Sequence, residues 1–184
     1  MLNPTQLDSI RDWACAGALR AEESMRDAHI CELGLEIRDI ACTPLCDLPE
    51  RLQSVDDACV AGAVARFSGT ISGSVLVAME PGDALLWARS RAAAGDPIED
   101  FLELAFEIQS QLVTSIGQGM GAEVELMLPH LCEDTVPAIL FGTHAPSDTA
   151  VLCFQAKAIA GEHVLPFSVY MMIDPKTLGF GLAH

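Results

Sequence analysis

Basic side chains are scarce in this sequence of 184 residues. Ten lysines and arginines stand against 26 aspartates and glutamates, which gives a formal net charge of −16. Nucleic-acid affinity comes mainly from neutralising phosphates with Lys and Arg, so this balance excludes nucleic acid as an expected partner. An anionic membrane surface is excluded by the same sign. Because 51% of the residues are hydrophobic, the chain is nevertheless expected to fold around a substantial core.

Long uncharged apolar runs are missing as well. None approaches the ~18 residues that a membrane span needs. The first twelve residues, MLNPTQLDSIRD, lack the basic start and apolar core of a signal peptide. We therefore expect a soluble cytoplasmic protein. At this length one domain is the default, so residues 1–184 are expected to form a single domain.

Metal-binding and phosphate-binding spacings are also absent. The seven cysteines lack the spacing of a disulfide scaffold, and the Cys42–Cys46 pair has no second pair or His-x3-His motif after it. The cysteines are therefore expected to be small buried hydrophobes, with redox or metal chemistry as the last alternative. The glycine-rich segment 117–121 lacks the Lys-Ser/Thr of a phosphate loop. The sequence predicts neither a metal nor a cofactor in this chain.

Two long helices are predicted from their start signals and apolar spacing. Asn3 and Pro4 can begin the first helix, and apolar residues then recur at three- and four-residue steps to about residue 28. Asp96, Pro97 and Glu99 form a capping box for the second helix, which glycines at 117–121 are expected to end. Its expected buried stripe is Ile98, Leu102, Ala105, Ile108, Leu112 and Ile116.

The remaining composition favours strands, with a loop at 43–50 and a short helix at 82–94. Strands are expected at 35–40, 59–67, 71–79, 122–128, 135–142, 150–159 and 163–173. Each long helix is followed by a glycine and a similar strand, at 34–37 and 121–124, so a helix-strand unit is expected twice. The pattern predicts an α+β fold with an antiparallel or mixed sheet and two long helices.

The second long helix also carries a polar strip outside its buried stripe. The members are Glu99, Glu103, Glu107, Ser110, Gln111 and Thr114. Helical neighbours at i+3 and i+4 lie side by side, so these residues share a face. From the pattern alone, a solvated face with acids near the positive end of the helix dipole is the favoured interpretation.

A family resemblance changes that interpretation. The segment EIQSQLVTSIGQGMGAEVELMLP at 107–129 resembles the second signature segment of the CheC/CheX/FliY family of chemotaxis proteins. In that signature a helix carries Glu-x-x-Asn and a proline follows the next strand. The segment 69–77 is similar to the family's glycine-bearing hairpin strand, and 168–173 to its closing strand. Because the family shares the helix-strand duplication, the resemblance covers nearly the whole chain.

The resemblance implies docking on a CheY-like response regulator and hydrolysis of its aspartyl phosphate. The family Glu pairs with the regulator's lysine, and the family Asn orients a water for in-line attack on phosphorus. An amide suits that task because it donates and accepts from one rigid plane. The resemblance places Mg²⁺ on the partner regulator and no cofactor in this chain. Relatives include monomers and strand-exchanging dimers, so a homodimer remains open.

The family positions transfer residue by residue to the second helix. Glu107 takes the Glu position, Ser110 the Asn position and Pro129 that of the trailing proline. A serine hydroxyl is shorter than an amide and rotates freely, so poorer water placement is expected; Gln111 offers an amide one turn beyond Glu107. The expected catalytic residues are Glu107, Ser110 and Gln111, and the expected partner contacts are Glu99, Glu103, Glu107 and Thr114.

The first helix departs further from the family pattern. Asp12 keeps an acid at the Glu position, but Cys15 puts a thiol where the amide belongs. No histidine lies nearby in the sequence to activate Cys15, so inert core is the favoured role. This copy is predicted to be a degenerate site.

The sequence therefore predicts a signal-transduction protein that docks on a phosphorylated CheY-like receiver domain. Whether it is a protein-aspartyl-phosphate phosphatase stays open because Ser110 replaces the family Asn. The alternative is a non-enzymatic module that binds the regulator or serves as a scaffold, as in the flagellar-switch relatives.

Overall fold

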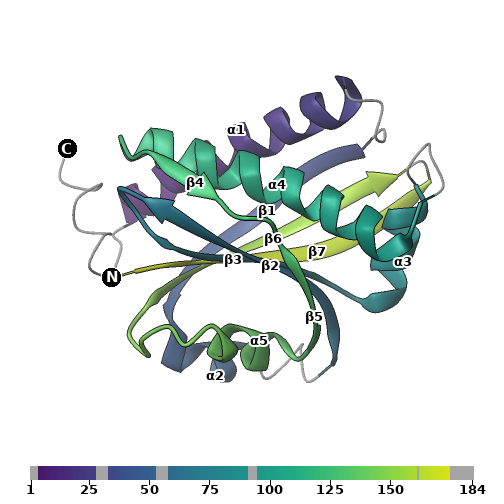
Figure 1. The fold of residues 1–184 in the computed structure, drawn as a ribbon. Coiled ribbons are helices and arrows are strands. Elements are labelled where there is room, and N and C mark those ends of the chain that lie inside the picture. The colour runs from purple at the N-terminus through teal and green to yellow at the C-terminus, as the bar shows by residue number, and fades with distance from the viewer. Residues whose placement is uncertain (1–3, 28–32, 53–57, 91–94, 161, 175–184) are drawn as a thin grey trace.

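The computed structural model describes residues 4–27, 33–52, 58–90, 95–160 and 162–174 (Figure 1). The helices are α1 (Pro4–Asp27), the 3-10 helix η1 (Leu45–Asp47), α2 (Leu48–Leu52), α3 (Pro81–Arg89), α4 (Pro97–Gly119) and α5 (Val136–Gly142). The strands are β1 (Leu33–Pro44), β2 (Val60–Gly69), β3 (Gly73–Met79), β4 (Val124–Leu126), β5 (His130–Asp134), β6 (Ala150–Ala160) and β7 (His163–Ile173). No described helix is long and apolar enough to cross a membrane.

The described strands form one sheet in the order β1-β6-β7-β3-β2-β4, and β5 also pairs with β2. Every described pairing is antiparallel. Such pairing lets short connections join neighbouring strands, as between β2 and β3 and between β6 and β7. The α+β class expected from the sequence is confirmed.

The expected duplication is visible in the order of the elements. A long helix, an edge strand, a short helix and a two-stranded hairpin occur first as α1-β1-α2-β2-β3 and again as α4-β4/β5-α5-β6-β7. Each edge strand pairs with the hairpin of the other half, since β1 pairs with β6 while β4 and β5 pair with β2. Each half of the chain therefore contributes an edge strand to the hairpin of the other half, and together they form the single sheet.

Helices cover both faces of this sheet (Figure 1). The larger hydrophobic cluster joins α1, α3 and α4 to one face, where the fully buried Trp87 stacks on Phe167 and meets Phe101 edge-on. The smaller cluster packs Leu48 of α2 and Leu140 of α5 against the opposite face. Two apolar faces are thus buried between three layers.

Several contacts hold α4 in place. The Asp96 carboxylate accepts a hydrogen bond from the Ile98 amide at 2.8 Å, as expected for the N-cap. The buried Gln109 donates from Nε2 to the carbonyl oxygen of Ala63 at 2.6 Å. A Cβ added at Gly17 of α1 would lie 2.9 Å from the backbone oxygen of Gln111, so a glycine is needed where α1 crosses α4.

Several expected elements differ from the structure. The segment 135–142, expected as a strand, contains helix α5, because the Thr135 hydroxyl caps Ala138 and Pro137 fits the first turn. The loop expected at 43–50 instead contains the end of β1, η1 and the start of α2. Only Val124–Leu126 of the strand expected at 122–128 is extended, and β5 was not expected. The last four residues of the helix expected at 82–94 lie outside the described residues.

Candidate functional site

The expected polar strip forms part of the open face of α4. Glu99 and Glu103 are exposed, and the other four members, Glu107, Ser110, Gln111 and Thr114, are partly exposed. The opposite side of the helix is buried against the sheet, α1 and α3. The structure therefore brings all six residues to one surface, as the spacing predicts.

Within this strip, Glu107 and Gln111 are joined by a hydrogen bond. The Gln111 amide nitrogen Nε2 donates to Glu107 Oε1 at 3.1 Å. The two residues are one helical turn apart, so the contact lies along the helix surface. Gln111 therefore orients the carboxylate that the family pattern singles out, and its amide nitrogen already has a partner in this arrangement.

Three apolar side chains of α4 are at least partly exposed, which was not expected. Ile98 is 52% exposed, while Leu102 and Phe106 are partly exposed. The first two were expected in the buried stripe, which correctly contains Ala105, Ile108, Leu112 and Ile116 but also takes in Phe101 and Leu104. The i, i+4, i+8 spacing of Ile98, Leu102 and Phe106 was the signal available in the sequence. Ile98 and Leu102 lie within about 20° of the buried Gln109 around the helix axis, so of the three only Phe106 lies near the acidic strip on the open face of α4.

The far end of the strip is bordered by α1. Arg20 of α1 donates from Nη1 to Gln118 Oε1 at 2.9 Å and to Ser115 Oγ at 3.2 Å. Ser115 is buried, whereas Ser110 and Thr114 are partly exposed. The open face of α4 therefore narrows toward its C-terminal end, where α1 crosses it.

The first copy of the motif looks different in the structure. Asp12 is exposed and Cys15 is partly exposed, so Cys15 is not the core residue that the sequence predicted. Trp13, between them, packs on Gly119, where an added Cβ would lie 2.1 Å from the Trp13 ring atom Cδ2. Among the described residues, no hydrogen bond or ion pair joins Asp12 or Cys15 to the α4 strip. In the structure, this part of α1 packs against the end of α4 through Trp13 and Gly119.

The expected burial of the cysteines is also only partly correct. Cys46 and Cys59 are exposed, and Cys15, Cys42, Cys132 and Cys153 are partly exposed. Cys31 lies outside the described residues. Burial raises the pKa of the Cys132 thiol. Within the described parts of the chain, no group of three His, Cys, Asp or Glu side chains is placed to hold a metal ion.

Pro129, the expected trailing proline, lies between β4 and β5 and is partly exposed. The two residues before it, Met127 and Leu128, are 59% and 80% exposed. The proline lies where the chain passes from one short strand at the edge of the sheet to the next, and both strands pair with β2.

Comparison with known proteins identifies the fold. No protein-family model and no curated protein matches the sequence. Among solved structures, FliY from Thermotoga maritima is similar with a TM-score of 0.66 and 11% identity, covering 97% of this chain and 94% of FliY. The FliM middle domain from Vibro alginolyticus has a TM-score of 0.61 and 11% identity, covering 89% of this chain and 93% of that domain.

A third similar structure is the chemotaxis protein CheX from Desulfovibrio desulfuricans. Its TM-score is 0.57 at 12% identity, and the match covers 88% of this chain and 99% of CheX. The family resemblance inferred from the sequence is thus confirmed at the level of the fold. The chain has the fold of the CheC/CheX/FliY family.

Proposed function

We propose that this protein docks on a CheY-like receiver domain through the open face of α4, with Glu107 as the principal contact. The observation that carries the proposal is the placement of Glu107, Ser110 and Gln111 together on that face, with Gln111 hydrogen-bonded to the Glu107 carboxylate. The fold shared with CheX and FliY supports it. Glu107 offers a carboxylate to a lysine of the receiver's phosphorylation site.

Apolar and acidic side chains on the open face of α4 would contribute differently to recognition. Burial of Phe106 against a partner would supply affinity, because removing apolar surface from water is favourable. Glu99, Glu103 and Glu107 would supply orientation and exclude partners that present acids there. A receiver domain with basic and apolar groups around its phosphorylation site fits both kinds of side chain.

Hydrolysis of the receiver's aspartyl phosphate is the catalytic extension of this proposal. Ser110 would have to orient the attacking water, and its hydroxyl is shorter and less rigid than the amide of the family pattern. The Gln111 amide nitrogen is engaged with Glu107, so it does not replace the missing amide in this arrangement. We therefore expect the chain to bind the receiver domain but to hydrolyse its aspartyl phosphate slowly. Any Mg²⁺ in the complex would belong to the receiver.

Binding without turnover is the second candidate function, and Ser110 is the residue that favours it. FliY and the FliM middle domain share this fold with CheX. The family resemblance in the sequence includes flagellar-switch relatives that bind without turnover. In that case the chain would act as a competitor or scaffold for the regulator. The acidic face of α4 would serve the same docking contact.

The proposal is tested by measuring affinity for a phosphorylated cognate CheY-like receiver domain. Glu107→Ala should weaken binding by about tenfold or more, since a hydrogen bond to a charged group contributes about 1.5–3 kcal/mol. Glu23→Ala, which removes an exposed acid from α1, is the matched control and should leave affinity unchanged. Equal affinities for Glu107→Ala and the unsubstituted protein would show that α4 is not the docking face.

Phosphate release in the same mixture separates the two candidates. Release faster than spontaneous decay of the receiver's phosphate would identify a phosphatase. Binding with no acceleration would identify the non-enzymatic module. Neither result changes the comparison of affinities between Glu107→Ala and the unsubstituted protein. Docking and hydrolysis are therefore tested independently.

A further inference from the structure

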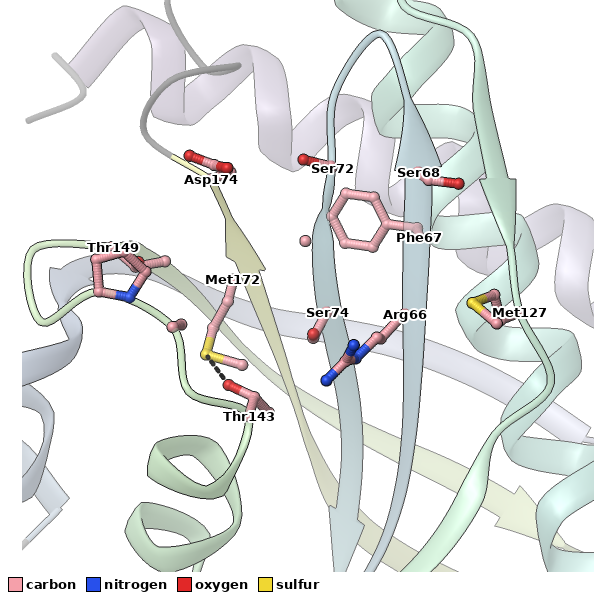
Figure 2. A pocket seen from close by; sticks show the side chains of 13 residues that line it. Arg66, Phe67, Ser68, Ser72, Ser74, Met127, Thr143, Thr149, Met172 and Asp174 are labelled. Carbon is pink, nitrogen blue, oxygen red and sulfur yellow. Dashed lines mark hydrogen bonds between the residues drawn. The ribbon is translucent and has the colours of Figure 1, made fainter.

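A hollow of about 330 Å³ lies on the side of the sheet away from α1 and α4. Arg66 of β2, Ser74 of β3 and Met172 of β7 stand in one cross-strand row at its floor. Figure 2 shows the Arg66 guanidinium, the Ser74 hydroxyl and the Met172 side chain around the same space, with Thr143 next to the Met172 sulfur. The volume lies at the lower end of the range for small-molecule sites.

The hollow exists because α5 ends before the sheet does. Val64, Leu76 and Tyr170 belong to the hydrophobic cluster that α5 covers. Two residues further along the strands, on the same face, come Arg66 and Ser74. The helix ends at Gly142, and the Thr143 hydroxyl then donates to the Leu140 carbonyl at 2.7 Å. The row at Arg66 is therefore left open.

The lining combines one cation with hydroxyls and apolar walls. Arg66 is exposed, and within the described part of the chain its guanidinium has no ion pair. Ser68, Ser72 and Ser74 add hydroxyls. Met127 and Met172 form the apolar part of the wall (Figure 2). A guanidinium with nearby hydroxyl donors is the combination that binds carboxylate or phosphate oxygens.

A second observation comes from Thr149, which also lines the hollow. The residue is 2% exposed, and its hydroxyl oxygen has no hydrogen-bond partner among the described residues. Leaving such a group unsatisfied costs about 1–3 kcal/mol. The oxygen is closed to solvent, so Thr149 makes the wall of the hollow more polar without contacting a ligand in this arrangement.

We propose that this hollow binds a small organic anion, with its carboxylate or phosphate on Arg66 and its apolar part against Met127 and Met172. The net charge of −16 opposes the approach of any anion, so a bare inorganic ion gains too little from one arginine. The apolar walls add the burial that an organic anion supplies. Asp174 also lines the hollow, away from Arg66 (Figure 2).

The experiment uses the full chain labelled with ¹³C at the methionine methyl groups. Met127 and Met172 line the hollow, whereas Met25 and Met120 lie in the core between the helices and the other sheet face. Phenyl phosphate and benzoate are titrated separately, with benzyl alcohol as the neutral probe and inorganic phosphate as the bare anion. We expect an aromatic anion to shift the Met127 and Met172 signals, with those of Met25 and Met120 unchanged.

The response of Arg66→Gln decides the role of the guanidinium. This variant should bind the aromatic anion about tenfold or more weakly, whereas Arg26→Gln, which removes an exposed arginine from α1, should bind it normally. Comparing phenyl phosphate with benzoate tells phosphate from carboxylate recognition, and either one supports the proposal. Equal binding of benzyl alcohol, equal binding by Arg66→Gln, or no selective shift of Met127 and Met172 would overturn it.

Discussion

Gln109 of α4 donates a hydrogen bond from its side-chain nitrogen to the backbone oxygen of Ala63 in β2, 2.6 Å away. The same nitrogen lies 3.3 Å from the carbonyl oxygen of Val75 in β3. Successive residues turn by about 100° around an α-helix, so Glu107 and Gln111 each lie roughly 160° from Gln109. A buried amide that points to the sheet thus turns the Glu107–Gln111 pair toward solvent.

Replacing Gln109 by leucine should therefore destabilise the fold. The substitution leaves buried carbonyl oxygens without their donor, which costs about 1–3 kcal/mol. Gln109 Oε1, which has no partner among the described residues, is removed at the same time, so the lower half of that range is expected. Urea unfolding measures the change. Gln111→Leu is the surface control. An equal loss of unfolding free energy in both variants would show that the Gln109 hydrogen bond does not stabilise the fold.

The crossing of α1 and α4 gives a second stability prediction. In Gly17→Ala the new methyl group would lie 2.9 Å from the Gln111 backbone oxygen and 3.0 Å from Leu112 Cα, and backbone atoms cannot rotate aside. Overpacking costs about 1–3 kcal/mol. The gain of alanine over glycine in a helix is at most ~1 kcal/mol, so Gly17→Ala should lower the midpoint of thermal unfolding.

Gly82 of α3 is the matched control for Gly17. Its added Cβ would meet no atom nearer than the Glu80 carboxylate oxygen at 4.0 Å. Gly82→Ala should therefore leave stability unchanged or raise it by up to ~1 kcal/mol. A Gly17→Ala protein as stable as Gly82→Ala would mean that α1 can move away from α4 at little cost.

The thiol of Cys46 provides a prediction about pH. Its Sγ donates to Asp47 Oδ1 at 3.3 Å, and that hydrogen bond, with the nearby negative charge, raises the pKa of the thiol. A raised pKa means less thiolate at a given pH, and the thiolate is the reactive form. Asp47→Ala should therefore speed alkylation of Cys46 by iodoacetamide at about pH 8, measured by peptide mass spectrometry. The exposed Cys59 is the internal control, and an unchanged Cys46 rate would contradict the assigned cause.

The long helices could be predicted because local signals and tertiary packing agree in them. Asp96 and Pro97 mark the start of α4, and most of its apolar spacing matches the face that is buried. For 135–142, an apolar run of this length does not distinguish strand from buried helix by periodicity. The Thr135 and Pro137 capping signal was present there and was given too little weight.

The sequence spacing predicts which residues form the polar strip, but it does not predict which other elements border that strip. The polar strip follows from i+3 and i+4 neighbours alone. The exposure of Ile98 depends on how α3 and β5 border the start of α4, where Leu85 and Leu131 line a shallow hollow beside it. The spacing did place Gln111 in the polar strip, but the hydrogen bond from Gln109 to Ala63 could not be predicted from it. The exposure of Ile98 and this bond both depend on residues distant in the chain, which local patterns do not encode.

Ser110→Asn tests whether one missing amide limits turnover. The variant restores a planar donor and acceptor beside Glu107, so it should raise phosphate release from a phosphorylated CheY-like receiver on the order of ten- to a hundredfold, the scale associated with small errors in positioning. Affinity for the receiver should stay the same, since Ser110 is not the principal contact. Release is measured above the spontaneous decay of the receiver alone.

Position along α4 must matter if that explanation is right. Thr114→Asn places the same amide one turn further along the strip and should leave phosphate release unchanged. Glu107→Ala in the Ser110→Asn background should return phosphate release to the spontaneous rate. The introduced amide can place a water only when Glu107 holds α4 in position on the receiver. Equal gains from Ser110→Asn and Thr114→Asn would mean that the amide does not act by placing a water. No gain from Ser110→Asn, with docking intact, would instead favour a protein that binds its regulator without turnover.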